Sequence, residues 1–146
     1  MAVIDMDRER RALQWAVAAL AIIPVAAGLY GVLFGPALTV DRATAWADSH
    51  YRQMSGLLFG AGLCLLSTVP AIEQRTGRFR LLVLLIFIAG IGRLIGFFLT
   101  GIASFSVVVG LTLELFVAPI LALWQTRVAN RYAETAGIAD LNKDAI

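Results

Sequence analysis

Two apolar runs in the second half of the chain constrain its fold most. Residues 81–100 and 105–124 are each long enough to cross a hydrocarbon core of about 30 Å. Each run holds one charged residue, Arg93 in the first and Glu114 in the second. The link at 101–104 is too short for anything but a tight antiparallel turn, and both charges lie roughly 10–12 Å below it at about 1.5 Å per residue. Opposite charges at one depth on neighbouring helices predict an ion pair inside the membrane.

Two further apolar runs complete the predicted membrane part. They cover residues 12–34 and 51–69, and Pro70 ends the second of them. Hydrophobic residues make up 60% of the 146-residue chain, against about 45–50% in soluble domains. We therefore predict an all-α fold: one membrane domain over residues 1–146, built as an integral membrane antiparallel four-helix bundle. Residues 125–146 form a polar, partly helical cytoplasmic tail in this prediction.

The arginines predict how the chain is oriented. They cluster at 8–11, 75–80 and 127–131, whereas the turn at 101–104 carries no charge. Because short cytoplasmic segments are enriched in Lys and Arg, both termini are expected inside. The first run is longer than the 7–15 residues of a signal-peptide core, so we expect it to be retained as a helix. A short external loop follows at 36–49, with a brief interfacial helix over 39–48 as an option.

Small residues form stripes along the first two spans. Gly28, Gly31 and Gly35 lie on about the same face of the first span, which lets another helix approach closely. On the second span a stripe recurs every four residues, at Arg52, Gly56, Gly60 and Cys64. Cys64 is the one cysteine in the chain, so it forms no internal disulfide, and we interpret it as a buried packing residue.

The polar residues of the outer half define a candidate site. We predict an outward-facing polar pocket that holds a ligand, and we expect Gly56, Gly60, Gly92 and Gly96 to leave space beside its two arginines. Its residues are Asp48, His50, Tyr51, Arg52, Arg93 and Glu114.

Three accounts of this site stay open. In the first, the charges of Arg52 and Arg93 exceed that of Glu114 by one positive charge. This excess would attract the anionic or carbonyl head of a lipid, fatty acid or quinone-like molecule. Alternatively, Asp48 neutralises Arg52 as its i, i+4 partner. In the third account the Arg93–Glu114 pair only fixes the register of the helices.

Other chemistries find less support in the residues. The single histidine, His50, with Asp48 lacks the number and type of ligands of a zinc or copper centre, so no metal and no cofactor are predicted. No basic run with interleaved aromatic residues indicates nucleic acid. A small membrane enzyme that uses Glu114 as acid/base on a lipid-like substrate is the alternative function.

Three segments carry a resemblance to a known family. They are DSHYRQMSGLLFGAGL (48–63), RFRLLVLLIFIAGIGRLIG (78–96) and GLTLELFVAPILALWQTRVA (110–129). Together they resemble the bacterial four-span family catalogued as domain of unknown function 4345. The resemblance implies a four-helix fold in the bacterial inner membrane, and it supplies no substrate.

The expectation for function is therefore an integral inner-membrane protein that is non-catalytic. It either holds a lipid-like or anionic amphiphilic ligand, or serves as an accessory membrane subunit. Its expected partners are the lipid bilayer, such a ligand, and another membrane protein or further copies of itself.

Overall fold

The computed structural model describes residues 2–38, 44–101 and 104–143. It is all-α over these residues, and four helical segments are long and apolar enough to cross a membrane. Those segments are Asp5–Phe34, Ala45–Ala71, Thr76–Thr100 and Phe105–Gly137. The protein is thus a multi-pass membrane protein with the four spans that the sequence predicts.

The helices are longer than the predicted spans. Helix α1 covers Ala2–Phe34 and runs through Pro24, and the 3-10 turn η1 follows at Gly35–Leu38. Helix α2 covers Ala45–Thr68, because the Thr44 hydroxyl accepts a hydrogen bond from the Ala47 N–H (3.2 Å) and caps the helix there. The separate interfacial helix predicted over 39–48 is wrong in its described part, which is the cap and first turn of α2; residues 39–43 lie outside the described residues.

The second half of the chain follows the same pattern. The 3-10 turn η2 (Val69–Ala71) leads to α3 at Thr76–Thr100, which ends at Gly101 in a left-handed conformation (φ 67°). Ser104 caps α4 (Phe105–Thr112), which continues as the π-helical segment η3 (Leu113–Val117) and as α5 (Ala118–Lys143). The predicted partly helical tail is helical throughout its described length.

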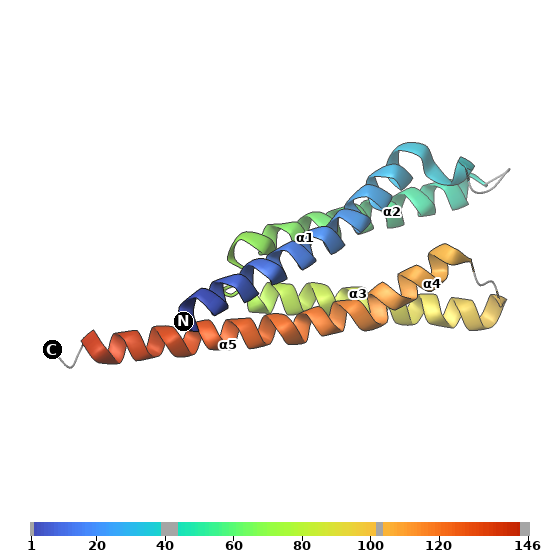
Figure 1. The fold of residues 1–146 in the computed structure, drawn as a ribbon. Coiled ribbons are helices and arrows are strands. Elements are labelled where there is room, and N and C mark those ends of the chain that lie inside the picture. The colour runs from blue at the N-terminus through green and yellow to red at the C-terminus, as the bar shows by residue number, and fades with distance from the viewer. Residues whose placement is uncertain (1, 39–43, 102–103, 144–146) are drawn as a thin grey trace. The chain divides into compact units, whose positions relative to one another are not determined.

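By its contacts the chain divides into two compact units, and each is described by itself. Unit 1 comprises Met1–Gln14 with Ala71–Ile146, and unit 2 comprises Trp15–Pro70. In unit 1, α3 and the continuous α4–η3–α5 rod form an antiparallel hairpin (Figure 1). Its buried residues include Ile72, Phe79, Val83, Ala118, Leu121 and Val128.

In unit 2, the second part of α1 packs antiparallel against α2. A Cβ at Gly28 would overlap the backbone of Phe59, and one at Gly62 would lie 2.9 Å from the Val25 nitrogen. The helices therefore meet backbone to backbone, which confirms the close approach predicted from the glycines of α1.

The stripe predicted on α2 lies beside α1 at Arg52 and Gly56, and the buried role predicted for Cys64 is wrong. A Cβ at Gly60 would meet nothing within 4 Å, and Cys64 is exposed instead of buried. The helices approach each other most closely at Ser55 and Gly62 of α2. These residues lie next to the row of residues that recurs every four positions from Arg52.

Large apolar side chains are exposed along all four spans, among them Ile22, Leu57, Leu84 and Leu123. A soluble protein would bury side chains of this kind. Their exposure fits helices whose outer faces contact lipid tails.

Candidate functional site

The hairpin of unit 1 brings Arg93 of α3 and Glu114 of η3 together. Arg93 Nε donates to Glu114 Oε2 at 2.9 Å, and Nη2 donates to Oε1 at 2.8 Å. Both bonds are short, and together they give the parallel two-bond geometry of the strongest arginine–carboxylate pairs. The ion pair predicted from equal depth is present.

Two glycines make room for this pair. A Cβ at Gly110 of α4 would lie 3.0 Å from Arg93 Nε, and a Cβ at Gly90 of α3 would lie 2.9 Å from Glu114 Cβ. Arg93 thus lies against Gly110, one turn before its partner Glu114. Glu114 lies against Gly90, one turn before its partner Arg93. The glycines predicted to leave space, Gly92 and Gly96, meet nothing within 4 Å and do not contact the pair.

Glu114 lies within a local change of helix type. The Ala118 N–H donates to the Leu113 carbonyl five residues back, which makes 113–117 a π-helical segment. Pro119 follows it and has no N–H to donate into the preceding turn. Single π-helical turns occur frequently at functional sites. The segment gives Glu114 a setting that differs from the rest of the span.

The two partners differ in exposure. The side chain of Arg93 is 41% exposed and that of Glu114 is 15% exposed. Glu114 uses both oxygens on Arg93, whereas a guanidinium has five N–H groups and two of them bind Glu114. Among the described residues no acceptor is found for Arg93 Nη1. The arginine therefore presents an unused edge of hydrogen-bond donors at membrane depth.

In unit 2, Arg52 and Asp48 pair one turn apart on α2. Arg52 Nε donates to Asp48 Oδ2 at 2.9 Å, and Nη1 donates to the Val32 carbonyl at 2.6 Å and the Leu33 carbonyl at 3.2 Å. These carbonyls end α1, where no helical N–H reaches them. Arg52 therefore caps α1, Asp48 balances its charge, and the alternative in which Asp48 neutralises Arg52 is the observed one.

The other two candidates of unit 2 also lie on α2. The His50 ring stacks on Trp46 with centroids 5.3 Å apart and planes 4° apart. Tyr51 lies against Gly31, since a Cβ there would be 3.2 Å from its Cε1 atom. Over the described ranges no group of three or more His, Cys, Asp or Glu side chains is placed to hold a metal ion.

The six candidates thus form two local pairs, a ring stack and one packing contact. Arg93 and Glu114 belong to unit 1, whereas Asp48, His50, Tyr51 and Arg52 belong to unit 2. The convergence of both groups on one pocket stays a prediction.

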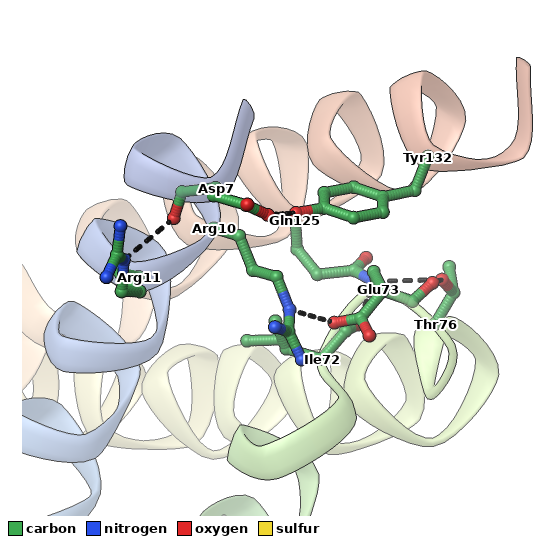
Figure 2. A network of polar contacts seen from close by, with 8 residues as sticks. All are labelled: Asp7, Arg10, Arg11, Ile72, Glu73, Thr76, Gln125 and Tyr132. Atoms are coloured by element: carbon green, nitrogen blue, oxygen red, sulfur yellow. Dashed lines mark hydrogen bonds and ion pairs between the residues drawn. The ribbon is translucent and has the colours of Figure 1, made fainter. Parts of the chain in front are cut away.

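A second polar group in unit 1 was missed from the sequence. We call it the terminal cluster; it joins the start of α1, the η2–α3 link and α5 (Figure 2). Its members are Asp7, Glu9, Arg10, Glu73, Thr76, Gln125, Arg131 and Tyr132.

Two sets of bonds hold the start of α1 in this cluster. Arg10 Nε donates to Glu73 Oε2 at 2.8 Å. Tyr132 donates its hydroxyl to Asp7 at 2.7 Å, and Arg131 binds Glu9. The first turns of α1 are therefore docked onto α5 and the link before α3.

At the centre of the cluster Gln125 is fully buried. Its Nε2 donates to the Ile72 carbonyl and to Thr76 Oγ1, both at 2.8 Å, and its Oε1 has no partner among the described residues. The signal in the sequence was acidic residues among arginines: Asp7 and Glu9 near Arg10, and Glu73 near Arg75. The partners of these acidic residues lie 63 or more positions away, so the pattern alone did not pair them.

Comparison with known proteins places the chain in a family. Neither a curated protein nor a solved structure matches it. One family model matches residues 12–125, a range that includes Arg93 and Glu114 and excludes the first eleven residues and the end of α5. The match covers well over half of the chain. The protein therefore belongs to the family described as Domain of unknown function (DUF4345).

Proposed function

We propose that this membrane protein is non-catalytic and holds a lipid-like molecule by its polar head at the Arg93–Glu114 pair. The observation that carries the proposal is the pair itself, a two-bond ion pair within the spans with donors left over on the arginine. Ionisable groups inside a membrane are costly and mark functional sites by default. The bacterial inner membrane, with both termini cytoplasmic, is the proposed location.

The asymmetry of the pair favours a ligand over a purely structural role. A pair that only fixes helix register needs no exposed part, and enclosing it would lower its cost. Here the side chain of Arg93 is 41% exposed, and the same span exposes large apolar side chains on its other faces, among them Ile91 and Ile95. A molecule with a polar head and an apolar body matches this combination.

The same contacts favour binding over catalysis. Both oxygens of Glu114 accept hydrogen bonds from Arg93, so a carboxylate used as acid or base would first have to leave the arginine. The second acid/base group considered, His50, stacks on Trp46 in the other unit. The enzyme alternative would need both side chains to change partners.

The function as an accessory membrane subunit is a second version of the proposal. The docked start of α1 and the long α5 build a polar end on unit 1 that goes beyond the residues matched by the family model. Such an end is where a partner protein or a second copy would make contact outside the lipid. Migration of the protein alone in native membranes would count against this version and leave the ligand-holding one intact.

Native mass spectrometry of gently extracted protein tests the ligand proposal. We compare wild type with Arg93→Gln and with the double variant Arg93→Gln, Glu114→Gln, which leaves no carboxylate stranded. Arg80→Gln is the matched control, because Arg80 lies on the same helix and binds a hydroxyl, that of Thr126.

A bound mass is expected on wild type and on Arg80→Gln, and it should be lost from both Arg93 variants. Protein without any bound mass in all four samples contradicts the proposal and leaves an ion pair that only fixes register. A mass that persists in the double variant places the ligand elsewhere.

A further inference from the structure

We infer that the head group bound at Arg93 is an uncharged carbonyl, carried by a free apolar molecule such as a long-chain ketone or quinone. The inference rests on the proposed function and narrows its ligand class. It uses three observations on unit 1 and unit 2: the charge balance of each pair, the donors left on Arg93, and the depth of Arg93 in its span.

The first observation is that no positive charge is left over at either pair. Glu114 balances Arg93 through two hydrogen bonds, and Asp48 balances Arg52, which also caps the end of α1. The surplus charge that would attract an anion is therefore absent from these residues. A carboxylate or phosphate beside Glu114 would add an uncompensated negative charge in an apolar medium, which is unfavourable.

The second observation is the kind of group that the arginine can bind. A guanidinium carries only donors, and its charge is not removed by deprotonation. The edge that Glu114 leaves unused therefore requires an acceptor. An ammonium head is excluded because it brings only donors and a second positive charge. A carbonyl oxygen offers two lone pairs without charge, and it brings no donor of its own that would need a partner.

The third observation separates a free molecule from the surrounding phospholipid. Arg93 lies eight positions before Gly101, which ends α3, or roughly 12 Å along the helix. The ester carbonyls of phospholipids lie at the edge of the hydrocarbon core, whereas a residue this far from the end of a membrane-spanning helix is expected inside that core. One turn nearer to Gly101, a Cβ at Gly96 would meet nothing within 4 Å, so the helix surface beside Arg93 is open. A molecule that lies wholly within the membrane reaches this depth.

The test compares three probes of matched chain length on purified protein. They are 2-heptadecanone as the neutral carbonyl, palmitate as the anion, and hexadecanol as a neutral head without a carbonyl. Affinity is read from the shift in thermal unfolding, in detergent and again in nanodiscs of phosphatidylcholine. Wild type and Arg80→Gln should bind the ketone about tenfold more tightly than palmitate or hexadecanol, in both media.

Glu114→Gln provides the decisive variant. It removes the carboxylate and leaves Arg93 with an unbalanced positive charge, so the preference should reverse and palmitate should bind more tightly than the ketone. The double variant Arg93→Gln, Glu114→Gln should lose the wild-type preference for the ketone over the other two probes. This reversal would not follow from loss of folding, which would abolish all binding.

Specific outcomes overturn the inference. Tighter binding of palmitate by wild type, equal binding of hexadecanol, or failure of the ketone to bind in nanodiscs each contradict a free neutral carbonyl ligand. A co-purified molecule with an acidic group also contradicts the neutral carbonyl ligand, but it is compatible with the proposed function. Absence of both a co-purified mass and any probe binding contradicts the proposed function itself.

Discussion

At the level of single residues, Arg93 and Glu114 depend on each other more than they stabilise the fold. Polar contacts in membranes average roughly 0.6 kcal/mol, yet a charged group left without its partner costs about 1–3 kcal/mol or more. We expect Arg93→Glu and Glu114→Arg each to lower the unfolding temperature in detergent, and the double exchange to recover part of the loss because it restores an opposite-charge pair. A double-mutant cycle measures the coupling, and additive losses would show that the two residues act independently.

The glycines beside the pair give a second prediction at this level. Gly90→Ala places a methyl group 2.9 Å from Glu114 Cβ and 2.8 Å from Leu115 Cδ2. Overpacking of this kind typically costs about 1–3 kcal/mol, so thermal unfolding should shift downward. Gly92→Ala is the control, since a Cβ there meets nothing within 4 Å, and alanine should stabilise the helix by about 0.5–1 kcal/mol. Equal effects of the two substitutions would show that Gly90 does not fit against η3.

At the level of elements, the π-helical segment explains why the site was only half predictable. The contact between Arg93 and Glu114 followed from depth, because both positions can be counted from one short turn. To predict which glycines lie beside the pair, one would also need to know how each helix is rotated about its own axis. In η3 the hydrogen bonds join residues five positions apart instead of four, and this changes the rotation of α5 relative to α4. Gly92 and Gly96 have open space beside them as predicted, whereas Gly90, which lies against Glu114, was missed.

Arg52 shows a second limit of reading one helix at a time. Its pairing with Asp48 was open to prediction, since both lie on α2 four residues apart. Its bonds to the Val32 and Leu33 carbonyls join it to a different helix across the link at 35–44. No spacing rule supplies that contact. The number, order and approximate bounds of the spans were predictable, because they depend only on hydrophobic length.

The role of Arg52 as a cap leads to a prediction for α1. Arg52→Ala removes the donors that satisfy the last carbonyls of this helix, so amide exchange near residues 32–38 should become faster and the protein should lose about 1–2 kcal/mol of stability. Hydrogen–deuterium exchange read by mass spectrometry measures the local effect. Gln53→Ala, at the next and exposed position on α2, is the control.

The same variant also tests the extent of the ligand site. If a mass bound to wild type survives in Arg52→Ala, then the site is limited to Arg93 and Glu114. Its loss, with amide exchange near residues 32–38 unchanged, would instead support the wider pocket that includes Arg52.

At the level of the whole molecule, the distribution of arginines determines the expected orientation in the membrane. Arg8, Arg10 and Arg11 begin the chain, Arg75, Arg78 and Arg80 flank the start of α3, and Arg127 and Arg131 lie on α5 after the fourth apolar run. Glu9 and Glu73 balance part of this charge through ion pairs with Arg10, Arg127 and Arg131. The turn at 101–104 carries none. Under the positive-inside rule we expect the arginine clusters in the cytoplasm and the turn outside.

Cysteine labelling of intact cells tests this orientation. Cys64 is exposed within a span, so we first replace it in Cys64→Ser. Gly77→Cys then marks the arginine-rich end, at a position where a Cβ meets nothing within 4 Å. Ser106→Cys marks the opposite end, on the exposed first turn of α4.

A membrane-impermeant maleimide should modify the cysteine at 106 in intact cells, and it should modify the one at 77 only after the membrane is opened. The reverse pattern would show that the termini are outside, and the Arg93–Glu114 pair would then lie in the inner half of the membrane.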